Sequence, residues 1–322
     1  MTEIKVETSD GQIWNINTVI VDLIQASLKG PVTIDLLGEG PCCETVGLNA
    51  LLDQIVEKFQ FDKNLYTIKT NNQVPSSRYK EVRYPFIELE FMKKNALEIQ
   101  HSDPSFEKHF GLFVSRSNWL RLALASYCYT HYQDQVLMTY HYNHNLDYHT
   151  CHFGLENFLN RNWDSIDQVS LFLKQLPIGA GNHSYPVLWN GRASELNMQY
   201  KNIFCDIVCE TYFSGRVFFM TEKIMRTIIN KRPFLVQGPQ WFLKNLKRLG
   251  FQTFDRWWDE GYDEDPWDYR YNGLKTNIDY IASQSPSTIE RWYNEMKPVL
   301  DHNYNTFLTL TQKQIIETEF YV

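Results

Sequence analysis

The sequence predicts an α/β protein made of two domains, each built on an open, mostly parallel sheet. Three observations lead to this expectation. The chain has 322 residues, about twice the length of an average domain. A series of strand, loop and helix patterns begins near residue 32, and a second series begins near residue 110. Strands that alternate with helices are typical of open, mostly parallel sheets.

The first series begins with a β-branched apolar run at 32–37, which predicts a buried strand. A glycine-rich loop follows, and apolar residues with helical spacing then fill 46–59. The run at 65–70 predicts the next strand. Pro104 lies in a polar stretch that is typical of a linker, so we place a domain boundary near residue 105.

The second series begins with a buried strand pattern at 110–114, followed by a helix over 120–132. Ser117 or Asn118 can serve as the N-cap of this helix. Gly250 ends a later helix as its C-cap. The remaining predicted elements are a strand at 203–209, a helix at 221–230, a strand at 233–236, a helix at 239–249, and terminal helices at 287–307 and 312–319.

Composition and charge narrow the class of protein. Aromatic residues make up 15% of the chain and charged residues 21%, with a net charge of -7, which is the composition of a globular protein rather than a disordered one. The acidic balance weakens the case for non-specific binding to nucleic acid. No apolar run approaches the roughly 18 residues of a membrane span, and the amino-terminal residues do not resemble a signal peptide. We therefore expect a cytoplasmic protein without stable membrane insertion.

The cysteines show neither metal-site nor disulfide spacing, and we expect buried thiols. They lie at positions 42, 43, 128, 151, 205 and 209.

One helix start carries the residues of an anion site. Thr221 is a predicted N-cap, and Glu222 and Lys223 occupy the first turn after it. Backbone N–H groups, the helix dipole and a lysine together suit a diphosphate. Glu210 or Glu222 can accept paired hydrogen bonds from ribose hydroxyls. The same residues could also form an ordinary capped helix with solvated charges.

Several motifs occur along the chain in the same order as in the fucosyltransferase-like glycosyltransferases. The chain therefore resembles this family, and within it a viral and bacterial branch. The resemblance covers roughly residues 108 to 305. The first hundred residues match this family only in architecture. The matching motifs are Val114 to Arg121 after a strand, Glu210-Thr211-Tyr212, Phe219-Met220-Thr221-Glu222-Lys223, the apolar strand that ends in Gly238, the run Leu249 to Asp255, and the run Trp258 to Asp263.

The resemblance implies a GT-B-type enzyme, in which two Rossmann-like domains face each other across a cleft. The acceptor-side domain would cover 1–105, and the donor-binding domain with C-terminal helices would cover 106–322. The resemblance also implies an inverting, metal-independent transfer from a nucleotide-sugar co-substrate, without a cofactor. Arg121 stands at the position of the family's pyrophosphate-binding arginine, and Arg116 is the other arginine that could take this role. Together with the helix N-terminus, Lys223 would stabilise the leaving diphosphate. Glu210 and Glu222 would hold the ribose or the sugar, beside Thr221.

Inverting transfer needs a base that removes the acceptor proton. Glu39 follows the first predicted strand between two glycines, and ligand-facing residues lie at this end of a parallel sheet. We therefore predict Glu39 as the catalytic base, although a carboxylate there could also cap the next helix. The other candidates are Glu88, Glu90 and His109.

Three further clusters have competing interpretations. His141, His144, His149, His152 and Cys151 are metal-ligand types, but their spacing fits no standard site, and we expect a polar loop and no metal. The acidic run 259–265 after Trp257 and Trp258 predicts an ordered loop on the cleft rather than a calcium loop. The densest basic region could line solvated helix faces or recruit a polyanion such as DNA. Its members are Lys223, Arg226, Lys231, Arg232, Lys244, Lys247 and Arg248.

The sequence therefore predicts a glycosyltransferase that moves a sugar from a nucleotide-sugar donor to an acceptor hydroxyl, with a glycan as the expected acceptor. The alternatives are a viral DNA-modifying glycosyltransferase that acts on hydroxylated bases and a non-catalytic module that binds nucleotides or glycans.

Overall fold

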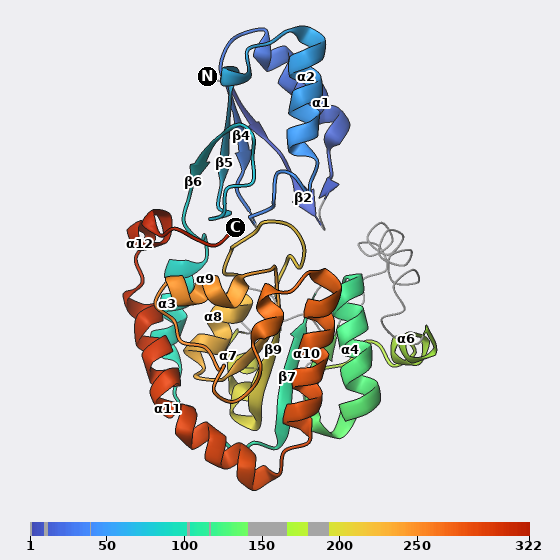
Figure 1. Cartoon of the computed structure of the whole chain (residues 1–322), viewed down its shortest axis with the longest axis vertical. Coiled ribbons are helices and arrows are strands. Elements are labelled where there is room, and N and C mark those ends of the chain that lie inside the picture. Colours follow the sequence, from blue (N-terminus) through green and yellow to red (C-terminus); the bar gives the residue numbers. More distant parts are fainter. Residues whose placement is uncertain are drawn as a thin grey trace.

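The computed structural model describes residues 2–9, 12–38, 40–101, 104–115, 117–140, 166–179 and 193–322. It contains two parallel sheets, each flanked by helices, in a smaller and a larger unit that are stacked along the long axis of the molecule (Figure 1). This architecture confirms the predicted α/β class with two Rossmann-like domains.

The first sheet has the strand order β1-β4-β5-β6, and its neighbouring strands pair in parallel. Its connecting helices α1 (Ile16–Ser27) and α2 (Leu48–Phe59) lie on the same side of the sheet (Figure 1). A short hairpin of β2 (Thr8–Ser9) and β3 (Gln12–Ile13) precedes α1. The strands are β1 (Thr2–Lys5), β4 (Val32–Leu36), β5 (Tyr66–Thr70) and β6 (Lys80–Arg83).

The second sheet has the order β10-β9-β7-β8, also with parallel neighbours. The strands are β7 (Lys108–Val114), β8 (Val136–Tyr140), β9 (Ile203–Cys209) and β10 (Phe234–Gln237). All residues of the central strand β9 are buried, as expected for a strand covered on both faces. The edge strand β10 is also fully buried.

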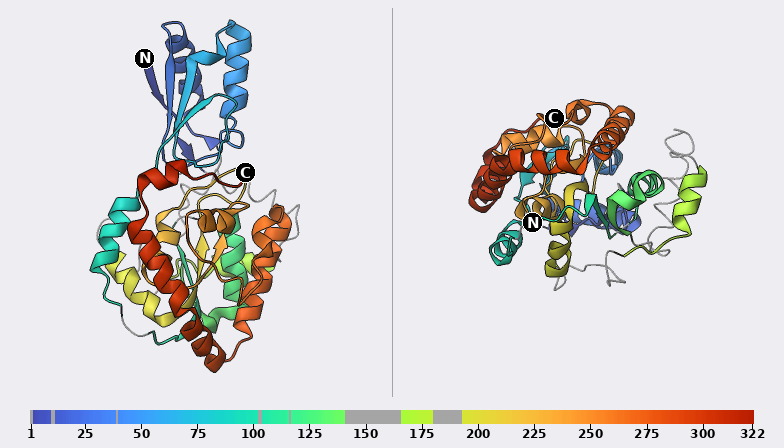
Figure 2. Two further views of the ribbon diagram at one scale, coloured as in Figure 1. Left: turned by 60° about the vertical axis from the view of Figure 1, so that its left-hand side comes forward. Right: turned by 90° about the horizontal axis from the view of Figure 1, so that it is seen from below.

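Helices cover both faces of the second sheet (Figures 1 and 2). Helices α4 (Trp119–Tyr132) and α10 (Trp267–Ala282) lie on one side, where the Tyr127 hydroxyl donates to Asp279. Helix α8 (Glu222–Ile229) lies on the other side, packed against α3 (Leu89–Glu98) and α11 (Pro286–Thr309). The other described helices are α6 (Ile166–Leu173), α7 (Ala193–Gln199), α9 (Phe242–Arg248) and α12 (Gln312–Glu317).

The hydrophobic contacts divide the chain near the end of β6. Leu89, Met92 and Ala96 of α3 belong to the core cluster of the second sheet, whereas α1 and α2 pack with the first. The boundary near residue 105 stays a prediction, and the packing joins α3 to the unit of the second sheet.

Most predicted elements are found within a few residues of their expected positions. Asn118 is the N-cap of α4 and accepts from Arg121 N at 3.0 Å, so it takes the role for which Ser117 was the other candidate. Gly250 follows α9 with a φ of 92°, a conformation that favours glycine. The five described cysteines are buried free thiols, as expected.

Candidate functional site

The strand order of the second sheet places its ligand-binding edge. The chain passes from β7 to β8 on one side, and the pair β9 and β10 lies on the other. The point between β7 and β9 is therefore a topological switch point, and open α/β sheets bind ligands outside the carboxyl ends of their strands at such a point. The residues that follow β7 and β9 are thus the first place to look for a site.

Glu210 follows β9 directly and is the least satisfied carboxyl group at this edge. Its side chain is 4% exposed, and neither carboxylate oxygen has a hydrogen-bond partner among the described residues. Its main chain is well held, because Glu210 N donates to Gln237 O at 3.0 Å and Glu210 O accepts from Arg121 Nη2 at 2.9 Å. The main chain of Glu210 is thus fixed while its carboxylate is unpaired, and this combination makes Glu210 a candidate for binding a ligand.

The N-terminus of α8 lies at the same edge. Thr221 is its N-cap, and its hydroxyl accepts from Lys223 N at 3.2 Å. The Lys223 ammonium lies 3.1 Å from a Glu222 carboxylate oxygen, and both side chains are about one fifth exposed. This end of the helix therefore offers backbone N–H groups and a reachable cation, as the sequence predicted.

Burial and charge separate the pKa values of the two carboxyl groups. Burial raises the pKa of Glu210 to about 7, although the charge of Lys223, the nearby hydroxyl of Thr221 and the charge of Arg121 oppose this shift. The hydroxyl of Thr221 is not within hydrogen-bond geometry of either carboxylate oxygen. Burial also acts on Glu222, but Lys223 and Arg226 outweigh it and lower the pKa of that group. Glu210 can therefore both donate and accept hydrogen bonds near neutral pH, whereas Glu222 stays ionised.

Of the two arginines predicted to bind pyrophosphate, only one lies among the described residues. Arg121 is 6% exposed, and its guanidinium braces the end of β9 through the bond to Glu210 O. Arg116 lies outside the described residues. The role of either arginine in binding pyrophosphate stays a prediction.

The candidates for the base lie in different parts of the molecule. Glu39, the predicted base, lies outside the described residues and follows β4 closely in the sequence. His109 is the second residue of β7 and contacts Gln284 O at 3.2 Å, so it lies at the amino end of the sheet, opposite the switch point. Glu90 is exposed and pairs with Lys93 at 3.4 Å. Glu88 is the half-buried N-cap residue of α3, near the junction of the two domains.

The segment from 211 to 220, here called the junction loop, joins Glu210 to Thr221 and contacts the first domain. The Asn72 amide donates to Arg216 O at 2.8 Å and accepts from Phe218 N at 3.0 Å. A Cβ on Gly40 would lie 2.9 Å from Phe219 Cβ, so the loop after β4 reaches the junction loop only because residue 40 is glycine. The carboxyl ends of both sheets therefore meet at this loop.

Sequence reasoning missed two residues that hold the junction loop. Asn72, at the end of β5, is fully buried. Arg270 of α10 is 3% exposed and donates to the carbonyl oxygens of Phe213, Gly238 and Asp265. An Asn-Asn-Gln run after a strand was the signal for the first. Arg270 gave no signal, because its partners are distant in sequence.

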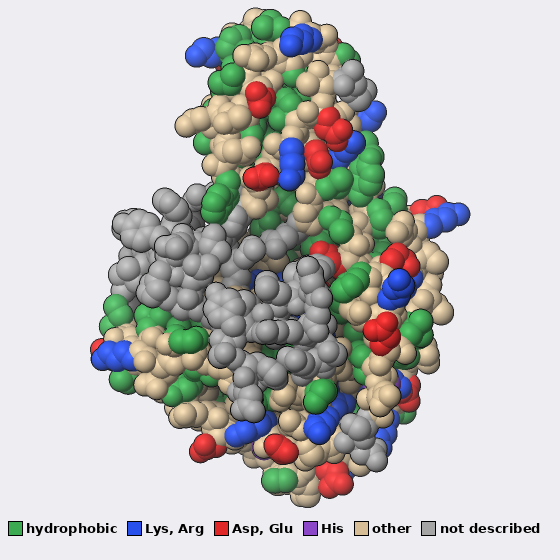
Figure 3. Space-filling model, turned by 180° about the vertical axis from the view of Figure 1, so that it is seen from behind, with side chains coloured by type: hydrophobic (Ala, Val, Ile, Leu, Met, Phe, Trp, Pro, Cys, Tyr) green, Lys and Arg blue, Asp and Glu red, His purple; other side chains and the backbone are tan. Residues whose placement is uncertain are grey.

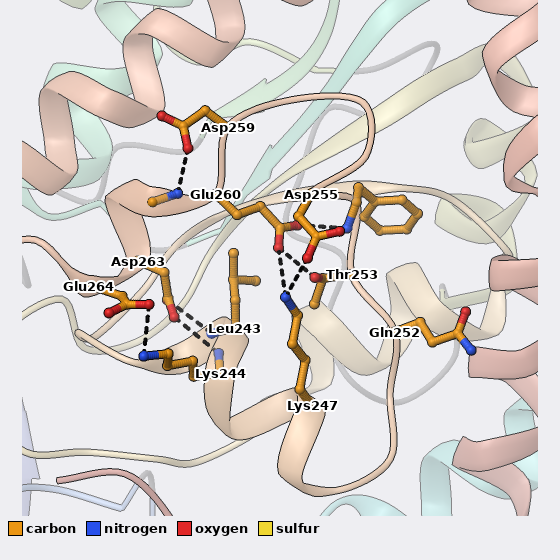
Figure 4. Close-up of polar contacts among 12 residues, drawn as sticks. Leu243, Lys244, Lys247, Gln252, Thr253, Asp255, Asp259, Glu260, Asp263 and Glu264 are labelled. Carbon is orange, nitrogen blue, oxygen red and sulfur yellow. Dashed lines mark hydrogen bonds and ion pairs between the residues drawn. The ribbon is translucent and has the colours of Figure 1, made fainter.

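The acidic run has a structural role (Figure 4). Asp263 accepts from Leu243 N at 2.9 Å and Lys244 N at 3.0 Å, so it caps the start of α9. Glu260 accepts from Phe254 N at 2.7 Å and lies 3.6 Å from Lys247 Nζ. Trp257 and Trp258 are buried beside Phe254, so their faces are not open to a sugar ring. The place of this loop on the cleft stays a prediction.

Most of the basic region is paired within the protein. Lys231 pairs with Asp301, Lys244 with Glu264, and Lys247 with Asp255, at 2.7 to 2.8 Å. The Arg232 side chain is buried and donates to Tyr200 O and the Tyr293 hydroxyl. Acidic and basic side chains of the described residues are interspersed on the face in Figure 3. Lys223, at the helix start, is the cation of this set that lies beside Glu210.

A second concavity lies at the other end of the second sheet. This pocket of about 540 Å³ is lined by residues at the carboxyl ends of α3, α7 and α8 and before β9 and β10, together with Tyr293 of α11. Arg232 and Lys231 on its wall are satisfied by carbonyl groups and Asp301, and helix C-termini there oppose an anion. It is therefore a weaker candidate than the switch point.

The predictions on metal binding and on membrane insertion can be compared with the described residues only. The histidine cluster with Cys151 lies outside the described residues. Among the described residues, no group of three or more His, Cys, Asp or Glu side chains could hold a metal ion. In the same part of the chain, no helix has the length and apolar character to cross a membrane.

Comparisons with known proteins reach only distant structures. No protein-family profile matches the sequence, and no curated protein matches it. The structure is similar to the N-terminal domain of trehalose-6-phosphate phosphatase from Candida albicans, with a TM-score of 0.43 and 10% identity over 88% of this chain and 63% of that chain. It is also similar to a structure described as trehalose-6-phosphate from E. coli bound with UDP-2-fluoro glucose, with a TM-score of 0.42 and 11% identity over 94% and 71% of the two chains. The chain thus spans less than two thirds of the first of these proteins, and similarity at this level supports no conclusion about activity.

Proposed function

We propose that this protein is a glycosyltransferase that binds a nucleotide-sugar donor at the switch point of its second sheet. The observation that carries the proposal is the Glu210 carboxylate, buried without a hydrogen-bond partner among the described residues, beside the N-terminus of α8. An unpaired buried carboxylate is costly. Paired hydroxyl groups, as on ribose or a sugar ring, would supply the missing donors.

The second half of the donor would be a diphosphate at the start of α8. Backbone N–H groups and Lys223 are positive there, and an anion at a helix N-terminus is favourable. These groups would also stabilise the charge that develops on the departing nucleoside diphosphate. The resemblance to the fucosyltransferase-like enzymes supports a diphosphate site at the start of α8. It also supports a sugar transfer that needs no metal and inverts the anomeric carbon. This proposal includes no cofactor.

For the reaction to balance, the acceptor hydroxyl must lose its proton as its oxygen forms the new bond to the anomeric carbon and the bond to the diphosphate breaks. A carboxylate near the junction of the two domains would take this proton. Glu39 remains our first candidate because it follows β4 at the end that faces the junction loop. Glu88, the N-cap residue of α3, is the next candidate, because nearby Phe86 packs on Phe218 and Phe219 at ring distances of 6.0 and 5.5 Å.

The proposed acceptor is a glycan, and modified DNA is the second candidate. A polyanion needs several cations free to contact phosphates. In the described basic region, Lys231, Lys244 and Lys247 already pair with carboxylates. This pairing favours an uncharged acceptor.

A thermal-shift panel tests the proposal directly. Wild-type protein is heated with UDP, GDP, CMP and dTDP, with their sugars, and with matched nucleosides that lack phosphate. A ligand at 100 times its Kd stabilises the fold by about 2.7 kcal/mol, so one nucleotide should raise the Tm clearly and its nucleoside should not. No shift with any of them would refute the donor site. Binding without slow donor hydrolysis or transfer would instead favour a non-catalytic module.

A further inference from the structure

The C-terminal tail, residues 318–322, lies against the junction loop between the two domains (Figures 1 and 2). The ring of Phe320 lies 4.7 Å from the ring of Phe218 in that loop. The ring of Tyr321 stacks on Trp241 at 5.8 Å with an interplanar angle of 15°. The tail therefore contacts the loop directly and rests on the segment that begins α9.

The tail is fixed to α9 independently of the loop. Tyr321 N donates to Asn245 Oδ1 at 2.7 Å, and Tyr321 O accepts from Asn245 Nδ2 at 3.3 Å. Asn245 is fully buried, so this paired contact has a rigid base. Arg248 lies 4.7 Å from the centre of the Tyr321 ring and adds a cation–π contact. A tail held in this way can act as a support for what it touches.

Phe218 is held from the opposite side by the first domain. Its carbonyl oxygen accepts from Gln73 N at 3.0 Å, and its N–H group donates to Asn72 Oδ1 at 3.0 Å. Its fully buried ring also contacts Phe242 at 5.5 Å. Phe218 is thus the residue at which the first domain, α9 and the tail meet.

The two ends of the junction loop are the two halves of the candidate site. Glu210 precedes the loop and Thr221 follows it, and no helix or strand lies between them. A loop without secondary structure holds its shape through tertiary contacts. The contacts of Phe218 therefore help to set where Glu210 lies relative to the N-terminus of α8.

We infer that the C-terminal tail is a positioning element for this site, with Phe320 and Tyr321 as positioning residues that hold the junction loop in its binding geometry. The ligand in this inference is the nucleotide donor, so the inference rests on the proposed function. Neither residue has to touch the donor, because both act through Phe218 and α9.

Hydrogen exchange of the full chain tests, without a ligand, whether the tail holds the junction loop in place. In Phe320→Ala, amides of 211–220 should exchange about tenfold faster than in the wild type, while amides of β9 and of the first sheet keep their protection. Phe320→Leu keeps apolar contact and should restore most of the protection. The control is Phe59→Ala, which removes a ring that stacks on Phe61 in the first domain and should leave 211–220 unchanged. Unchanged exchange of the loop in Phe320→Ala, or a uniform increase along the chain, would overturn the inference.

Calorimetry with the nucleoside diphosphate that gives the largest thermal shift then tests the link to the site. Phe320→Ala and Tyr321→Ala should raise its Kd about tenfold, which is a loss of about 1.4 kcal/mol, and Tyr321→Phe should bind as the wild type does. Wild-type affinity in both alanine variants would overturn the inference and leave the proposed function intact. If no nucleotide binds even the wild type, the proposed function fails, and with it this role of the tail.

Discussion

Replacing Glu210 by glutamine should stabilise the unliganded protein while weakening donor binding. The amide keeps the shape of the side chain but cannot ionise. In the folded wild type, burial raises the pKa of Glu210 to about 7 from the ordinary 4.5. That difference of about 2.5 units, at 1.36 kcal/mol per unit, amounts to on the order of 3 kcal/mol.

The sign of the pH dependence follows from proton binding. Between about pH 4.5 and 7 the folded state retains a proton on Glu210 that the unfolded chain has lost, so the free energy of unfolding of the wild type falls as the pH rises through this window. Glutamine has no such titration. The stability difference between Glu210→Gln and wild type should therefore grow by roughly 3 kcal/mol from pH 4.5 to 8. Asp206, Glu260 and Asp263 also have raised pKa values, but they titrate in both proteins and cancel.

Urea unfolding at several pH values measures this difference, and Glu222→Gln is the matched control. Because Lys223 and Arg226 outweigh burial and lower the pKa of Glu222, this group contributes stability above its unfolded pKa, and that stability is lost on acidification. Glu222→Gln should therefore be less stable than wild type at pH 7, the opposite sign. A stability difference for Glu210→Gln that is flat with pH would refute the reasoning.

Four further outcomes are expected. Lys223→Gln should raise the Kd of the nucleoside diphosphate at least about tenfold in calorimetry, whereas Lys297→Gln, an exposed lysine of α11, should not. Activity should survive EDTA, and loss on chelation with recovery on added manganese would contradict a metal-independent transfer. Glu39→Gln should lower turnover about a hundredfold with donor affinity unchanged, and near-normal turnover would transfer the role to Glu88, tested in the same way. Transfer to a neutral glycan should barely change between about 50 and 200 mM salt, whereas a steep fall with a DNA acceptor would favour the DNA-modifying alternative.

Elements with strong local patterns were predictable from the sequence, and those that depend on tertiary packing were not. Strand β9 has the predicted bounds, because every one of its residues is buried and all but Asp206 are apolar. Helix α10 was missed, because its sequence is polar and aromatic and two of the three carbonyl groups that satisfy its buried Arg270 are distant in sequence. Helix α3 was missed for a similar reason, since its apolar face is completed by α8 and α11.

The part of the candidate site at the start of α8 could be predicted from neighbouring residues. The part that depends on contacts between distant segments of the chain could not. Thr221, Glu222 and Lys223 have the expected local geometry, since capping depends on neighbouring residues. The sequence could not show that Glu210 is buried without a partner, because that depends on the whole edge of the sheet. Asn72 joins the domains through residues more than 140 positions away, which no local pattern reveals.

The energetics of Glu210 explain why the surrounding contacts are so extensive. Relative to the unfolded chain, the raised pKa of this carboxyl group lowers the stability of the unliganded protein by on the order of 3 kcal/mol near neutral pH, a large fraction of the stability of a typical domain. A loop that could move would expose the carboxylate to water and remove the cost together with the binding geometry. Arg121 fixes the main chain at the start of the junction loop, Asn72 fixes its middle from the first domain, and Phe320 packs on it from the other side. These contacts keep the carboxylate dry, so that donor hydroxyl groups, rather than water, would complete its hydrogen bonds.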